Sequence, residues 1–205
     1  MSVTIILLAA GTSSRTASQG FHKLLAEFEG LPLLRKMARI AKSSKASAVV
    51  VVLGHQHEVL AAALDDLDVT VTINENYASG MASSIAQGFA TDQAKNADGV
   101  MVMLADMPQI STAHLDRMID VFHEAGGNSV VRAVCGEKPG NPVIMPRSLY
   151  GSVLQLKGDG GARRLIETCG LPIIGVELGL AAQNDVDTPE AIAAAGGVPA
   201  KSQPS

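Results

Sequence analysis

The chain has 205 residues, of which 47% are hydrophobic but only 3% aromatic, and it contains no tryptophan. This length suits one medium-sized domain with a core of aliphatic side chains and methionine. A formal net charge of −4 argues against a broad basic surface, so we expect no nucleic-acid partner, although a few local cations can still bind a small anion.

Short apolar runs alternate along the chain with longer segments of helical period. The apolar stretch at the start covers about ten residues without a basic flank, which is too few to cross a bilayer, so its run 3–8 is expected to form a buried strand. Further strands are expected at 48–53, 69–73, 100–104, 129–134, 143–145 and 173–176. Between these runs, apolar residues recur at intervals of three and four, as in Leu33, Leu34, Met37 and Ile40.

This alternation predicts an α/β fold: a single domain over residues 1–195, with a mainly parallel sheet and helices on both faces. The last ten residues, "GGVPAKSQPS" at 196–205, are small residues and prolines, and we expect them to be disordered. The two cysteines, Cys135 and Cys169, have no metal-type spacing and suit a reducing compartment. We therefore expect a cytoplasmic protein with no membrane partner.

The first strand leads into "LAAGTSSR", residues 8–15, where ligands of such sheets usually bind. Ala9, Ala10 and Gly11 leave backbone N–H groups uncovered, so that phosphate oxygens can approach them. Arg15 can add a bidentate contact and Lys23 a mobile charge. The alternative is a plain strand-to-loop turn with solvated cations, since neither GxxxxGK[ST] nor GxGxxG occurs in the chain.

Asp106 directly follows the apolar run "VMVMLA". A carboxylate at the carboxyl end of a central strand is costly to desolvate unless it binds a partner, and Mg²⁺ with substrate phosphates is a natural one. The alternative is a capping or turn role, but Ser111 or Thr112 is better placed to cap the helix that follows. We therefore favour Asp106 as a metal ligand.

A second carboxylate comes from "NDVDTPE". Asp187 lies just before a helix start with Thr188 as the cap and Pro189 in the first helical position, and Asp185 could face the same way. Either carboxylate could instead serve only to stabilise the helix dipole. Asp106 and Asp187 at two strand ends, with a phosphate-binding loop, form a more specific combination than any one of them.

The stretch "NYASGMASSI" places Gly80 at a tight turn, before a helix that Ser83 and Ser84 are expected to open. Its hydroxyls and free N–H groups could contact the edge of a nucleobase, while ordinary serine capping is the alternative. His55 and His57 in "GHQHE" lack a third ligand at zinc spacing, so we expect no zinc site there.

Together the segments "LAAGTSSR…HKLL", "GMASS", "LADMP", "GNPVIMPRSLY", "GDGGARRLI" and "NDVDTPE" resemble the MobA-like nucleotidyltransferases over about residues 3–195. The chain is most similar to the branch of molybdenum cofactor cytidylyltransferases, on the basis of "LAAG" rather than "LAGG", "GMASS" and "GDGGAR". The resemblance implies a Rossmann-like nucleotidyltransferase fold and transfer of CMP from CTP to the phosphate of molybdopterin carrying molybdenum, with release of pyrophosphate. It also implies Mg²⁺ as cofactor, and a molybdoenzyme or chaperone as the recipient of the product.

The resemblance also implies roles for individual residues. The backbone of Leu8, Ala9, Ala10 and Gly11 would bind the nucleotide, with Gly80 and Ser84 at the cytosine and Gly54, at the end of the second strand, lining the same pocket. Arg15, Lys23 and Asp106 would be catalytic, Asp106 and Asp187 would bind the metal, and Asn141 and Arg163 would face the phosphorylated pterin acceptor.

The chain departs from the family pattern at two places. In "RTASQGFHK", Gly20 lies five residues after Arg15 and Lys23 eight residues after it, whereas the family usually has the glycine and the lysine sooner. Asn141 stands where the family often has histidine. Transfer of another nucleotide, a sugar or polyol phosphate acceptor, and an NAD(P)-dependent oxidoreductase that reuses the fold remain alternatives.

Overall fold

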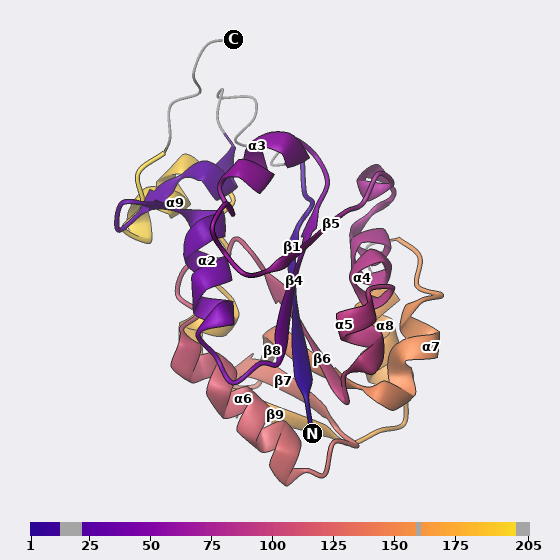
Figure 1. Cartoon of the computed structure of the whole chain (residues 1–205). Helices are drawn as coiled ribbons and strands as arrows, with labels where there is room; N and C mark the ends of the chain where they lie inside the picture. Colours follow the sequence, from indigo (N-terminus) through magenta and orange to yellow (C-terminus); the bar gives the residue numbers. More distant parts are fainter. Residues whose placement is uncertain (13–21, 159–160, 200–205) are drawn as a thin grey trace.

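The computed structural model describes residues 1–12, 22–158 and 161–199 of the chain (Figure 1). A seven-stranded sheet forms its centre, in the order β5-β4-β1-β6-β8-β7-β9. Its strands are β1 (Val3–Ala9), β4 (Ala48–Leu53), β5 (Thr70–Ile73), β6 (Gly99–Leu104), β7 (Val130–Cys135), β8 (Lys138–Pro146) and β9 (Ile173–Glu177). Every neighbouring pair is parallel except the two that involve β8, so the predicted α/β class and mainly parallel sheet are confirmed.

Helices cover both faces of the sheet, because successive residues of each buried strand point to opposite sides. Ile5 and Leu7 of β1 pack in one apolar cluster with α2 and α6, whereas Ile6 and Leu8 pack in a second cluster with α4 and α8. Figure 1 shows these two helix layers on either side of the sheet. The α-helices are α2 (Leu33–Lys42), α3 (His57–Ala62), α4 (Met81–Phe89), α5 (Asp92–Asn96), α6 (Thr112–Glu124), α7 (Tyr150–Val153), α8 (Gly161–Thr168) and α9 (Pro189–Ala194). Four short 3₁₀ helices complete the described elements: η1 (Lys23–Leu25), η2 (Tyr77–Ser79), η3 (Arg147–Leu149) and η4 (Gly179–Ala182).

The predicted helix starts are confirmed where the sequence carries a cap. The hydroxyl of Ser111 accepts a hydrogen bond from the backbone of His114, and the hydroxyl of Thr188 accepts one from Ala191. Helix α4 differs, because it begins at Met81 with Gly80 as its N-cap, ahead of the two serines expected to open it. The φ of Gly80 is +108°, a backbone conformation that only glycine adopts readily.

All seven predicted strands form, but β8 is longer than the expected segment 143–145. Its first half, "KPGNP", contains prolines and a glycine, which are typical of turns, yet it pairs with β7 across the hairpin at Gly136 and Glu137. A small hairpin of β2 (Glu27–Phe28) and β3 (Leu31–Pro32) is also present. Such two-residue strands have no periodic signal in a sequence.

The expected disordered tail needs a correction at its start. Val198 pairs with Glu27 through two backbone hydrogen bonds of 2.8 Å, and a Cβ on Gly197 would contact the ring of Phe28 at 2.4 Å. The fold therefore continues to residue 199, beyond the expected boundary at 195, while 200–205 lie outside the described residues. Among the described helices, none combines the length and the apolar composition needed to cross a membrane.

Gly140 of β8 allows η4, which precedes Asp185 and Asp187 in the chain, to lie close to the sheet. A Cβ at this position would lie 2.1 Å from the backbone oxygen of Ala182 in η4. We expect Gly140→Ala to lower the free energy of unfolding by about 1–3 kcal/mol, because backbone atoms cannot rotate away from the added methyl group. Urea unfolding measures this change, with Gly151→Ala as the control, since a Cβ on Gly151 meets nothing within 4 Å. Equal stability of the two variants would contradict this account.

Candidate active site

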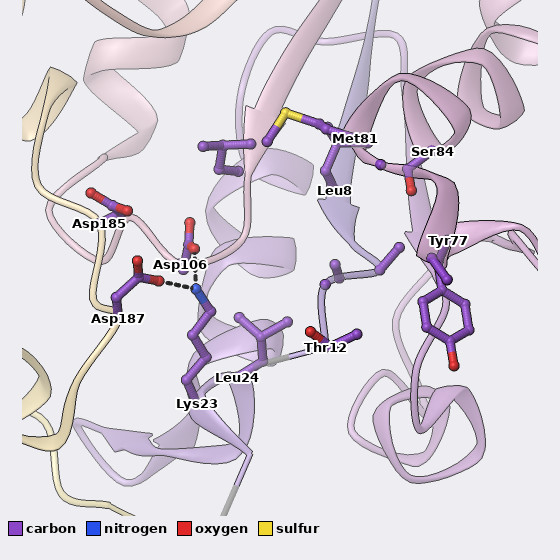
Figure 2. Close-up of a pocket in the computed structure, with 16 residues that line it drawn as sticks. Leu8, Thr12, Lys23, Leu24, Tyr77, Met81, Ser84, Asp106, Asp185 and Asp187 are labelled. Atoms are coloured by element: carbon purple, nitrogen blue, oxygen red, sulfur yellow. Dashed lines mark hydrogen bonds and ion pairs between the residues drawn. The ribbon is translucent and has the colours of Figure 1, made fainter. Parts of the chain in front are cut away.

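The candidate site lies at the carboxyl ends of β1 and β6, where the sheet turns from parallel to antiparallel pairing. A cavity of about 450 Å³ opens there, large enough for a nucleotide. Its lining residues come from the ends of both strands, from η1, η2 and α4, and from the segment before α9: Leu8, Ala9, Ala10, Gly11, Thr12, Lys23, Leu24, Tyr77, Ala78, Gly80, Met81, Ser84, Leu104, Asp106, Asp185 and Asp187. Figure 2 shows the carboxylates and Lys23 at one end of this cavity, and Tyr77, Met81 and Ser84 at the other.

Lys23 joins the two predicted carboxylates. Its Nζ lies 2.5 Å from Asp106 Oδ2 and 2.6 Å from Asp187 Oδ1, so one ammonium group bridges residues that are far apart in sequence (Figure 2). Burial by itself would lower the pKa of Lys23, but the charge of Asp106 and the hydrogen bonds to both carboxylates outweigh it and raise the pKa above its usual value. Lys23 is therefore a cation in this site.

The carboxylates fit a divalent cation. Asp106, Asp185 and Asp187 can each offer one oxygen within 4.8 Å of the other two. The second oxygen of Asp106, Oδ1, is buried and has no hydrogen-bond partner among the described residues. These three carboxylates offer only oxygen ligands, which suit a hard ion such as Mg²⁺ or Mn²⁺. Asp185 is thus a third candidate ligand beside the expected pair, Asp106 and Asp187.

His22 positions Lys23 by capping the short helix η1. Its Nδ1 accepts a hydrogen bond of 3.2 Å from the backbone N–H of Leu24, which requires that this nitrogen be unprotonated. Burial first, and then the positive charges of His55 and Lys23, lower the pKa of His22 to about 4. His22 is therefore neutral at pH 7.

We expect the protein to lose stability as the pH falls below 6.5. The unfolded chain binds a proton at His22 near pH 6.5, whereas the folded protein binds it only near pH 4, so acid favours the unfolded state between these values. The loss from His22 is about 2 kcal/mol between pH 6.5 and 5. His22→Gln keeps an acceptor for Leu24 but cannot titrate, so denaturant unfolding of the variant should lack this component. Identical pH profiles for the variant and the wild type would contradict the assignment.

The other end of the cavity is less polar. Tyr77 and Ala78 of η2 form one wall, next to Gly80 and Met81 at the start of α4. Gly54 lies behind this wall, because a Cβ there would come within 2.8 Å of both the Ala10 oxygen and the Tyr77 Cβ. Gly54 thus allows the end of β4 to approach both segments without lining the cavity itself.

The structure brings most of the predicted site residues together. Nine of them line the cavity: Leu8, Ala9, Ala10, Gly11, Lys23, Gly80, Ser84, Asp106 and Asp187. Asn141 and Arg163, predicted to face the acceptor, are not in the lining; Asn141 lies in β8 and Arg163 in α8, where it pairs with Glu167 at 2.9 Å. Arg15 lies outside the described residues.

Several residues that shape the site were not among the predicted ones. Tyr77 lies in the 3₁₀ helix η2, which is too short to show periodicity, and His22 carries no signal other than its place directly before "KLL". Arg132 of β7 donates to the Gly140 carbonyl at 3.3 Å, and its pKa is lowered by burial and by the neighbouring charge of Arg163. In the sequence, Arg132 is marked only by being a single arginine inside an apolar run.

Similar proteins are found by sequence. Residues 5–173 match the model of the MobA-like NTP transferase domain. The chain is 28% identical over 201 residues to the purine catabolism protein PucB of Bacillus subtilis, covering 90% of this chain and 91% of PucB. It is 29% identical over 167 residues to nicotine blue oxidoreductase of Paenarthrobacter nicotinovorans, covering 78% of this chain and 79% of that protein.

The fold is also found in solved structures. The crystal structure of Rv0371c from Mycobacterium tuberculosis H37Rv superimposes with a TM-score of 0.81 at 25% identity, covering 95% of this chain and 97% of that one. A crystal structure of Rv0371c in complex with manganese gives a TM-score of 0.78 at 23% identity, with coverage of 95% and 98%.

Proposed function

The chain belongs to the family of MobA-like NTP transferase domains, and on that premise we propose that it transfers CMP from CTP to the phosphate of molybdenum-loaded molybdopterin, releasing pyrophosphate. The observation that carries this proposal is the cavity with two unlike ends. Three carboxylates and one lysine lie at one end, and an aromatic wall with serine and backbone groups lies at the other. A nucleoside triphosphate has the same division between a charged chain and a flat base.

The proposed reaction needs charge neutralisation more than proton transfer. An oxygen of the acceptor phosphate attacks Pα of CTP, the bond from Pα to the oxygen bridging to Pβ breaks, and pyrophosphate leaves with the electron pair. Because the acceptor phosphate is already an anion, no side chain has to deprotonate it. The chain must instead hold two polyanions together, with the attacking oxygen in line with the bond that breaks. This positioning and charge neutralisation contribute several kcal/mol of transition-state stabilisation.

Asp106, Asp185 and Asp187 would hold the divalent cation, for which we propose Mg²⁺. When bound, the cation would neutralise phosphate oxygens and help to orient Pα. The manganese in the Rv0371c complex supports a divalent cation in this family of folds. Lys23 would leave the carboxylates and stabilise charge on the triphosphate, together with the backbone of 8–11, which lines the cavity, and with Arg15.

On the acceptor side we propose Asn141, Arg163 and also Arg132. Burial first, and then the charge of Arg163, lower the pKa of Arg132, and only Glu167 pairs with Arg163 in the described part of the chain. Arg132 also contacts the backbone at Gly140, next to Asn141. Guanidinium groups suit a phosphorylated acceptor, because they can bind phosphate oxygens in a bidentate manner. A molybdoenzyme or its chaperone would receive the product.

A second candidate function is NAD(P)-dependent oxidoreduction, favoured by the similarity to nicotine blue oxidoreductase. Hydride transfer has no need of three convergent carboxylates, and this is why we favour nucleotide transfer. One assay separates the two: pyrophosphate release with CTP, GTP, ATP and UTP, with and without Mg²⁺, using the molybdenum-loaded cofactor as acceptor. We expect release with CTP, dependent on both Mg²⁺ and acceptor. Oxidation of NAD(P)H without release from any triphosphate would refute nucleotide transfer.

A further inference from the structure

Asn74 connects the end of β5 to helix α4 behind the less polar end of the cavity, which Tyr77, Met81 and Ser84 line and which would hold the base. Its side chain is buried, with 3% of its surface exposed. The amide Nδ2 donates to the hydroxyl of Ser83 at 2.8 Å and to the hydroxyl of Ser84 at 2.9 Å. One amide group thus uses both of its hydrogens on two adjacent serines.

The orientation of this amide is fixed by the backbone. The N–H of Asn76 donates to Asn74 Oδ1 at 3.0 Å. If the amide were turned over, its NH₂ group would face the N–H of Asn76, and two donors would oppose each other. The oxygen of Asn74 must therefore face Asn76, and both serine hydroxyls must accept from its nitrogen.

The two serines differ in what their own protons can do. The single hydroxyl proton of Ser83 has two backbone acceptors within reach, the oxygens of Gly80 at 2.8 Å and of Asn76 at 3.0 Å, so it is satisfied within the protein. The hydroxyl of Ser84 has no acceptor among the described residues, although the side chain is largely buried and lines the cavity. A buried hydroxyl proton without an acceptor is costly, so a ligand group is expected to accept it.

We infer that Asn74 is a positioning residue that fixes Ser84 as a hydrogen-bond donor, so that the site selects a nucleobase with an acceptor at that point. This inference rests on the proposed function and deepens it. Cytosine has acceptors at both N3 and O2, whereas uracil carries a proton on N3. A serine held as a donor therefore favours cytosine over uracil at the ring nitrogen. Free serine hydroxyls, which can rotate to donate or accept, would not discriminate in this way.

The variant Asn74→Asp tests whether Asn74 fixes Ser84 as a donor. Aspartate has almost the same shape as asparagine, but it has an acceptor in place of the NH₂ group. A carboxylate at position 74 still accepts from Asn76, but it also attracts the proton of Ser84, which then presents a lone pair to the cavity. We expect the ratio of CTP to UTP affinity, measured by calorimetry with Mg²⁺ present, to fall at least about tenfold. The added negative charge weakens both triphosphates alike, so the ratio is insensitive to it.

Ser83→Ala is the matched control, because Ser83 bonds to Asn74 but does not line the cavity. Its ratio of CTP to UTP affinity should stay within about twofold of the wild-type ratio. If circular dichroism shows that Asn74→Asp does not fold, Asn74→Ala replaces it: the released hydroxyl can rotate, so the ratio should still fall. An unchanged ratio in the folded Asn74 variant, or equal binding of CTP and UTP by the wild type, would overturn the inference. Failure of the wild type to bind any triphosphate would instead refute the proposed function.

Discussion

Replacing Asp106 with asparagine is expected to lower the rate of Mg²⁺-dependent nucleotide transfer by at least about 10³-fold, since a metal at a transferring phosphate contributes several kcal/mol. Asp106 lies directly after the central strand β6, and its Oδ1 has no other partner in the described part of the chain. Asparagine keeps the size of the side chain but removes the charge that holds a divalent cation. The measurement is the initial rate of pyrophosphate release at saturating CTP.

The same variant should remain folded, because Lys23 keeps its 2.6 Å contact with Asp187. Thermal unfolding followed by circular dichroism checks this. Asp120→Asn is the control for loss of one aspartate: Asp120 pairs with Lys45 on the surface, away from the cavity, and the variant should keep the wild-type rate. An Asp106→Asn protein with a near-normal rate would show that the metal assignment is wrong.

Replacing Lys23 with methionine is expected to change two measurements in opposite directions. In the absence of nucleotide, the affinity for Mn²⁺ should rise by about tenfold or more, because the Lys23 ammonium occupies the space between Asp106 and Asp187 and competes with a metal. A unit charge at about 4 Å is worth roughly 4 kcal/mol at an effective dielectric constant of 20, so a tenfold change is a modest expectation. Calorimetry or the paramagnetic resonance of free Mn²⁺ measures it.

With CTP and acceptor present, the rate of the Lys23→Met protein should instead fall by about 10²-fold, since a cation that stabilises the transferring phosphate has been removed. Lys42→Met is the control, because Lys42 pairs with the exposed Asp68 on the surface. Both the metal affinity and the rate of this control should match the wild type. Weaker Mn²⁺ binding by Lys23→Met would contradict competition at the carboxylates.

The strand positions and the carboxylates could be predicted because their signals are local. Each buried strand is a run of apolar residues, and Asp106 and Asp187 directly follow or precede an element whose ends the sequence marks with Pro and Thr. The meeting of these two residues, 81 positions apart, depends on the segment before α9, which returns to the end of β6: the N–H of Val186 donates to the backbone oxygen of Asp106 at 2.9 Å. The capping roles of Ser111 and Thr188 follow from the same local chemistry.

The supporting contacts could not be predicted because they depend on tertiary geometry. The bond from Asn74 to Ser84 joins a strand end to a helix across the turn at η2, and no periodicity marks it. His22 caps a helix of three residues, and Tyr77 reaches the cavity from another helix of three residues, η2. The sequence pattern of "KPGNP" predicts a turn, whereas pairing with β7 makes it the first half of β8.

The most direct test of the central claim is the transfer of label from CTP carrying ³²P at the α-position to molybdenum-loaded molybdopterin, compared in the wild type and in Asp106→Asn. We expect label in the product only when Mg²⁺, acceptor and wild-type protein are all present, with unlabelled pyrophosphate released in equal amount. Label that remains in CTP under these conditions, or transfer of equal rate by Asp106→Asn, would contradict the account.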